Sequence, residues 1–289
     1  MDIFIRTFTL SFSVFGRMIL PVLGISIASF IITNLLNLVT AGLAGYLSGP
    51  VTATFISLFG IRVALSVLGH HGRPMYDMMI LFSVLYGVFF IIAKGVLLLL
   101  PEVVAVLIAD GKLGDVISIQ NFLQADSSLQ FAFYVLSIKT IVSFVLYTSI
   151  YVAMAVPMAN AARSASQGSA SAGFFTGFGR SFLPLFCIFA VPFLLQFLFG
   201  FLASLYVLLP LVLSVISIVF SQTLPDFDLD IIVNGLVASA CLLWLHSLIW
   251  SASAVALTKS DKTSKQIRAA KAPPAAEKPD LRALRKSRE

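Results

Sequence analysis

The sequence predicts an all-α, polytopic membrane protein with six transmembrane helices arranged as three hairpin repeats. Three observations lead to this prediction. The 289 residues are 59% hydrophobic and only 11% charged, whereas soluble domains carry about 25% charged residues. Six stretches are long and apolar enough to cross a bilayer. The pattern FGR-x-x-LP opens two of the long apolar regions, at Phe15–Pro21 and at Phe178–Pro184.

A spanning helix needs about 20 mostly apolar residues, and six stretches meet this requirement. The predicted spans are Met18–Val39, Val51–Leu68, Met78–Leu100, Leu129–Met158, Ser181–Leu205 and Ile231–Leu257. The residues before the first span lack a short apolar core followed by a small-residue cleavage site. We therefore expect this end to be retained rather than removed as a signal peptide.

Positive residues in short loops predict the orientation, because cytoplasmic loops carry an excess of Lys and Arg. With six spans, one side receives the basic C-terminal tail and the arginines Arg6, Arg17, Arg62, Arg73, Arg163 and Arg180. The opposite side receives mostly Asp and Glu, with Lys112 as its only loop cation. Both termini are therefore predicted to be cytoplasmic.

The apolar stretch Tyr206–Ser221 has three interpretations: an interfacial helix, a re-entrant segment or a seventh span. A seventh span would export the basic tail, against the bias of the positive loops. We therefore predict a short interfacial segment on the outer face after the fifth span. A similar segment is predicted after the third span, where Pro101 also precedes an apolar run.

The spans group as three consecutive hairpins, and each hairpin begins after an inner segment that contains Gly and Arg. These segments are Phe15-Gly16-Arg17, Gly72-Arg73-Pro74 and Phe178-Gly179-Arg180. The second span of each hairpin ends in a run of small or aliphatic residues, at Val63–Ser66, Ala153–Val156 and Ala252–Val255. Repeats related in this way share one orientation, as in transporters built from parallel repeats.

The charge divides the chain into a membrane domain at residues 1–258 and a tail at residues 259–289. The tail holds ten Lys/Arg and four Asp/Glu, which accounts for the whole net charge of +6. Such a composition cannot bury a core, so we expect the tail to be mostly disordered. It serves either as a solvated end that enforces topology or as a contact for anionic lipid.

Ionisable residues inside spans are the first candidates for function. Lys94 and Lys139 lie in the outer halves of the third and fourth spans. Each either extends its ammonium to the interface or joins the other in an anion or lipid-headgroup site. Arg17, Arg73 and Arg180, at the inner ends, complete the set of candidate anion or lipid contacts.

His246 lies near the middle of the last span, where one hydrogen bond to a neighbouring helix would hold a neutral ring. No His, Cys or carboxylate follows at the spacing of a metal site, and Cys187 and Cys241 are interpreted as buried thiols. No HExxH, GxSxG, P-loop or CxxC pattern is present. The sequence thus predicts no enzyme activity, no cofactor and no nucleic-acid partner.

Consecutive hairpins with lead-in segments at Phe15-Gly16-Arg17 and Phe178-Gly179-Arg180 resemble a loose group of uncharacterised six-helix bacterial inner-membrane proteins. The plan is also similar to the membrane domain fused to some glycerophosphodiester phosphodiesterases. The soluble phosphodiesterase part has no counterpart here. The resemblance therefore implies a fold and a bacterial inner-membrane location, and it implies no catalytic residues.

Two hypotheses of function follow from the sequence. The first is a non-enzymatic inner-membrane protein that associates with a protein complex or with lipids, as an assembly or envelope-maintenance factor. The second is a transporter, or a lipid or anion translocator, that uses Lys94 and Lys139. The absence of acids within the spans disfavours coupling to protons or sodium.

Overall fold

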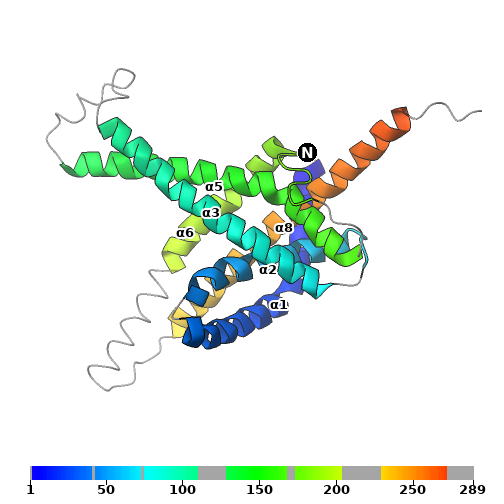
Figure 1. Cartoon of the computed structure of the whole chain (residues 1–289), viewed down its shortest axis with the longest axis horizontal. Coiled ribbons are helices and arrows are strands. Elements are labelled where there is room, and N and C mark those ends of the chain that lie inside the picture. The colour runs from blue at the N-terminus through cyan, green and yellow to red at the C-terminus, as the bar shows by residue number, and fades with distance from the viewer. Residues whose placement is uncertain are drawn as a thin grey trace, which may run out of the picture.

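The computed structural model describes residues 2–40, 43–72, 75–109, 128–167, 173–203 and 229–271, and all regular structure in these ranges is helical (Figure 1). The helices are α1 (Asp2–Thr40), α2 (Leu43–Val67), α3 (Tyr76–Ala109), α5 (Ser128–Gln167), α6 (Phe182–Ala203) and α8 (Leu229–Lys271). This agrees with the predicted all-α class. The stretch Tyr206–Ser221 and the end of the tail, 272–289, lie outside the described residues.

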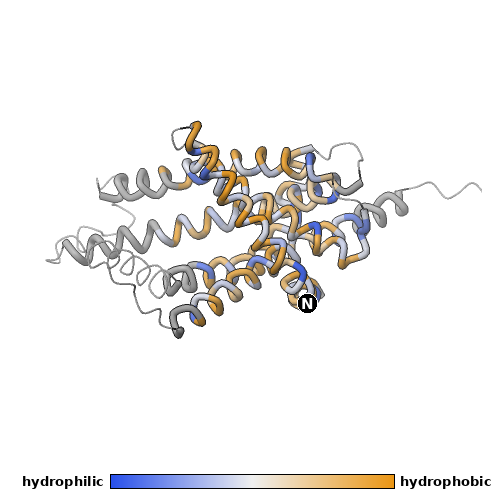
Figure 2. The backbone as a smooth tube through the Cα atoms, turned by 90° about the horizontal axis from the view of Figure 1, so that it is seen from below, coloured by the Kyte–Doolittle hydropathy of each residue, from blue (hydrophilic) through white to orange (hydrophobic). Residues whose placement is uncertain are grey.

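Five helices contain apolar stretches long enough to cross a membrane within the described part of the chain. These stretches are Ile3–Thr40, Ala44–Val67, Tyr76–Leu97, Thr140–Ala165 and Val233–Lys262. In α6 the corresponding apolar run, Phe182–Gln196, is shorter. Large apolar side chains on α1 are openly exposed, including Leu20 at 78% and Phe30 at 71%. Figure 2 shows apolar residues recurring along every helix, as expected for a multi-pass protein in lipid.

The first helix begins earlier than the predicted span at Met18–Val39. α1 runs without a break from Asp2 to Thr40 and is about 58 Å long at 1.5 Å per residue. Its buried positions recur at intervals of three and four, at Thr7, Leu10, Ser11, Val14 and Met18, and α1 contacts α8. This packed stripe explains why the helix includes the predicted lead-in.

The segment between the first two predicted spans, residues 40–50, is mostly helix in its described part. α2 begins at Leu43, because two side chains of α1 cap it: Thr40 Oγ1 accepts from Ala44 N–H at 3.1 Å, and Asn37 Oδ1 accepts from Gly45 N–H at 2.8 Å. These bonds satisfy donors that a helix start leaves open. The connection is therefore tighter than its three glycines and Pro50 suggested.

Two helices continue past the predicted ends of their spans. α3 continues across Pro101 to Ala109, so the outer segment predicted to follow Leu100 is part of the same helix. Pro101 costs the helix one backbone hydrogen bond. Ending the helix there would leave the N–H groups of all the following residues without their helical partners, so the helix continues. At the other end, α8 continues past Leu257 to Lys271, so the first part of the predicted tail is helical.

Contacts between the helices follow a simple order. α2, α5 and α8 contact one another and form the centre. α1 contacts α8 and α2, α3 contacts α2 and α5, and α6 contacts α5 and α8. Each outer helix thus lies against two of the three central helices.

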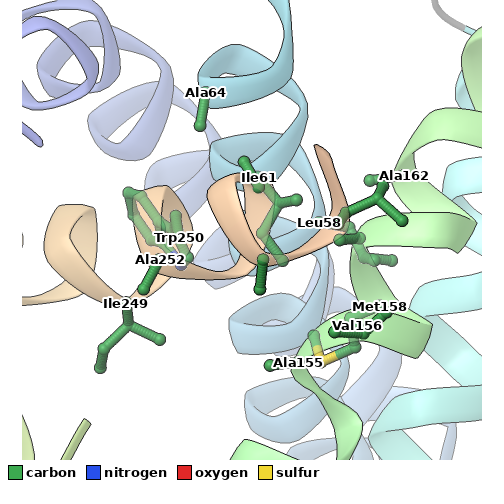
Figure 3. Close-up of a cluster of buried hydrophobic side chains, with 14 of the residues drawn as sticks. Leu58, Ile61, Ala64, Ala155, Val156, Met158, Ala162, Ile249, Trp250 and Ala252 are labelled. Carbon is green, nitrogen blue, oxygen red and sulfur yellow. The ribbon is translucent and has the colours of Figure 1, made fainter. Parts of the chain in front are cut away.

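The core lies where the three central helices meet, and it is built from small and aliphatic side chains (Figure 3). Ala64 of α2, Ala155 of α5 and Ala252 of α8 are at most 2% exposed. Trp250 lies flat against α2, and a Cβ on Gly60 would be 2.3 Å from its ring. Small residues allow this close approach, which lipid-embedded helices need because hydrophobicity alone does not hold them together.

Candidate functional site

A cavity of about 460 Å³ lies beside this core, and side chains of all six described helices line it. α1 contributes Val22 and α3 contributes Phe90, while α2, α5, α6 and α8 supply the remaining walls. The volume falls within the range of roughly 300–1,000 Å³ typical of small-ligand sites. We call this space the central cavity.

Neutral polar groups project from four of the walls. They are Thr54 and Ser57 of α2, Tyr147 and Tyr151 of α5, Gln196 of α6, and Ser239, His246 and Ser253 of α8. None of the residues that line the central cavity within the described part of the chain is Asp, Glu, Lys or Arg. In its described lining, the cavity is therefore polar at points and carries no charged side chain.

His246 and Gln196 form the main polar contact of the central cavity. His246 Nδ1 lies 3.2 Å from Gln196 Nε2 and 2.9 Å from the carbonyl oxygen of Leu242, one turn back in α8. The histidine thus bridges its own helix and α6. Sequence analysis placed His246 at a contact with a neighbouring helix but did not single out Gln196, which is a polar amide within a strongly apolar run.

An aromatic cluster forms another part of the cavity wall. Tyr151 stacks on Phe90 of α3 with ring centroids 4.4 Å apart. Phe193 of α6 meets both Tyr147 and Tyr151 edge-on, each at 5.4 Å. Such ring pairs prefer these offset and perpendicular geometries, which hold the side chains in place. The wall therefore offers a fixed apolar surface rather than a set of mobile side chains.

The predicted cationic residues lie elsewhere. Lys94 is exposed on α3 and Arg17 is exposed on α1, and neither lines the central cavity. Arg180 is also exposed, and its Nη1 donates to Ser260 Oγ at 2.9 Å. Arg73 and the side chain of Lys139 lie outside the described residues. Among the described members, the predicted anion contacts therefore do not line this site.

The residues before α6 form a turn, 173–181, that contacts both α3 and α5. Tyr86 of α3 donates its hydroxyl to the carbonyl of Phe174 at 3.0 Å, and the two rings stack at 4.3 Å. Asn160 of α5 donates from Nδ2 to the carbonyl of Thr176 at 2.9 Å. We call this segment the α6 turn.

A proline in α5 provides the next contact of the α6 turn. Pro157 has no N–H, so the carbonyl of Ala153 one turn earlier has no helical partner. Gly179 N–H of the turn donates to that carbonyl at 3.1 Å. Gly177 and Gly179 have φ angles of 88° and 69°, a left-handed conformation that favours glycine.

An ion pair joins α5 to the extension of α8 at the same end. Arg163 Nη1 bonds to Asp261 Oδ2, and its Nη2 donates to Asn160 Oδ1 at 3.0 Å. Together with Arg180 and Ser260, these groups link α5, the α6 turn and α8 beside the packed core. They are partly exposed, so they fix geometry more than they stabilise the fold.

The arrangement provides hydrogen-bonding groups and apolar walls for binding. Cys187 and Cys241 are free thiols, but Cys187 is exposed and Cys241 is half-buried, so the expectation that both are buried is wrong. Within the described ranges, no three His, Cys, Asp or Glu side chains gather as metal ligands would. The chain matches no protein-family model, no curated protein and no solved structure. The resemblance stated above therefore rests on the quoted residues alone.

Proposed function

We propose that the protein is a non-enzymatic, multi-pass protein of the bacterial inner membrane that acts by association, and that its ligand is a lipid held in the central cavity. The cavity is the observation that carries this proposal, because it is a site of ligand size to which all six described helices contribute. The helices around the cavity are apolar, so the bilayer is the most direct source of a ligand.

The proposed topology has six spans, both termini in the cytoplasm, and three hairpins: α1 with α2, α3 with α5, and α6 with α8. The order of helix contacts supports the repeat, because the first helix of each hairpin contacts its own partner and the second helix of the preceding hairpin. The positive residues beside α2, α5 and α8 support the orientation.

Native mass spectrometry after gentle detergent extraction tests the proposed function. We expect a lipid to remain bound to the wild-type chain and to be lost in Ser57→Leu, which fills the central cavity with a larger apolar side chain. The matched control is Ser48→Leu on the same helix, which faces a separate groove between α1, α2 and α3. That variant should keep the lipid.

The other outcomes also decide the proposal. A stoichiometric protein partner without any lipid would favour association with a protein complex and remove the cavity from the function. Equal lipid retention in Ser57→Leu and wild type would place the lipid outside the central cavity, either in the groove between α1, α2 and α3 or on the outer surface of the helices. Either result would contradict the proposed site.

The alternative of an anion translocator that uses Lys94 and Lys139 has less support, because Lys94 does not line the central cavity. Its test is the double variant Lys94→Met and Lys139→Met. On that alternative, substrate-dependent stabilisation should disappear while membrane insertion stays intact. We expect both to be unchanged.

A further inference from the structure

We infer that the central cavity selects an uncharged lipid whose head carries a hydroxyl group, and that His246 and Gln196 recognise this hydroxyl. This inference rests on the proposed function and adds the chemical class of the ligand. Three features support it: the lack of charged side chains in the described lining, the position of the proton on His246, and the orientation of the Gln196 amide.

The absence of charge among the described lining residues argues against a charged lipid head. A phosphate or carboxylate taken out of water needs a paired cation, because an unpaired ion costs several kcal/mol even after relaxation. The central cavity offers no Lys or Arg in its described lining. It likewise offers no carboxylate to an ammonium group. An uncharged head is the one that this site can desolvate at low cost.

The hydrogen bond of His246 to its own helix determines which of its two ring nitrogens carries the proton and which can accept a hydrogen bond. The carbonyl oxygen of Leu242 can only accept, so the His246 Nδ1 atom, 2.9 Å away, carries the proton. In a neutral imidazole the other nitrogen, Nε2, then holds a lone pair. His246 lines the cavity, and Nε2 is then the ring atom left to accept a hydrogen bond from a ligand.

The orientation of Gln196 follows from the same proton. A protonated Nδ1 cannot accept from the amide nitrogen placed 3.2 Å away, and amide oxygen and nitrogen positions are assigned from such networks. Rotating the amide by half a turn brings its oxygen to the Nδ1 proton. The NH₂ group is then available as a donor within the cavity.

An acceptor on His246 and a donor on Gln196 match a hydroxyl group, which donates one hydrogen bond and accepts others. A ligand hydroxyl would donate to His246 Nε2 and accept from the Gln196 NH₂. The aromatic wall of Phe90, Tyr151 and Phe193 would contact the apolar body of the same molecule. Diacylglycerols and reduced isoprenoid quinones share this chemistry.

Thermal stabilisation of the full-length chain in detergent, measured with four short lipids, tests the inference. The probes are dioctanoylglycerol, its acetyl ester without the hydroxyl, dioctanoyl phosphatidic acid with a phosphate in its place, and decylubiquinol. We expect dioctanoylglycerol or decylubiquinol, whichever is the source of the hydroxyl, to bind at least roughly tenfold more tightly than the acetyl ester and phosphatidic acid.

Two variants test the assigned residues. His246→Phe keeps a ring and removes the acceptor, and Gln196→Met keeps the length and removes the donor. Each should weaken binding of the preferred probe by roughly tenfold and leave the weak binding of the acetyl ester unchanged. His71→Phe, an exposed substitution of the same kind outside the cavity, is the matched control. The comparison of probes on the wild-type chain remains decisive if a variant does not fold.

Three results would overturn the inference. If phosphatidic acid binds more tightly than the hydroxyl probes, and this binding is lost in the Lys94→Met and Lys139→Met double variant, the inference is overturned while a lipid-binding function remains. Equal binding of dioctanoylglycerol and its acetyl ester would remove the role of the hydroxyl. No stabilisation by any probe would overturn both the inference and the proposed cavity site.

Discussion

The two FGR-x-x-LP segments share a sequence pattern and differ completely in structure. Residues 15–21 lie inside α1, where Gly16 is helical and has open space around it. Residues 178–184 begin in the α6 turn, where Gly179 has a φ of 69°, and end in the first turn of α6. The same residue pattern thus lies in the interior of α1 and at the start of α6.

The difference comes from what each segment packs against. The residues before Gly16 form a buried stripe at helical spacing, and the helix is already established when it reaches Pro21. The segment before Phe178 is rich in Ser, Ala and Gly and has no such stripe. It is fixed instead by hydrogen bonds from Tyr86 and Asn160 and to the Ala153 carbonyl that Pro157 leaves open. Tertiary contacts therefore decide the local structure.

The largest expected effect is at Gly177 of the α6 turn. Its φ is 88°, and an added Cβ would be 2.6 Å from Val156 Cγ1. Left-handed strain and overpacking together should make Gly177→Ala less stable by roughly 2–4 kcal/mol. Thermal unfolding in detergent would measure this loss. An unchanged midpoint would mean that the turn does not adopt this conformation.

A smaller effect is expected at Asn160, which is 6% exposed and joins the α6 turn to α5. Asn160→Leu removes the donor to the Thr176 carbonyl and the acceptor for Arg163. Leaving buried polar groups without these partners costs about 1–3 kcal/mol. The same unfolding measurement applies, with Asn34→Leu on the exposed surface of α1 as the matched control. Similar stability of the two variants would show that the turn is held by other contacts.

The smallest effect gives the sharpest contrast, because the two motif glycines should respond with opposite signs. Gly179→Ala places a side chain at positive φ and should destabilise by about 1–2 kcal/mol. Gly16→Ala replaces a helical glycine in open space and should stabilise by about 0.5–1 kcal/mol. Parallel unfolding curves of the two variants test this. Shifts of the same sign would mean that the segments share one conformation.

Sequence reasoning identified the all-α class and the apolar helices, because hydropathy directly reports which stretches belong in lipid. α6 begins within one residue of the predicted Ser181. Hydropathy does not report capping or packing, and so the starts of α1 and α2 and the continuation of α3 across Pro101 were missed. The small-residue runs of three spans were recognised, but their meeting in one core depends on the arrangement of helices.

Of the candidate residues named from the sequence, His246 is the one that lines the central cavity in the described part of the chain. Attention to ionisable residues led to Lys94 and Lys139 rather than to the neutral groups that line the central cavity. Gln196 was visible as an amide in an apolar helix, and Tyr147 and Tyr151 as polar-tipped rings one turn apart. Their convergence could not be predicted, since it requires residues from α5, α6 and α8 to face the same point. Pro157 in the sequence indicates that the Ala153 carbonyl oxygen has no helical donor, and this is the oxygen to which Gly179 N–H donates.

The most direct test of a lipid site in the central cavity is an experimental structure of the gently extracted chain in a lipid nanodisc. The account predicts elongated density between the aromatic wall and α8, with its polar end within hydrogen-bonding distance of His246 Nε2 and Gln196. The account would be contradicted by a collapsed cavity in which Tyr151, Phe193 and Trp250 pack directly against one another, with lipid density only on the outer faces of the helices.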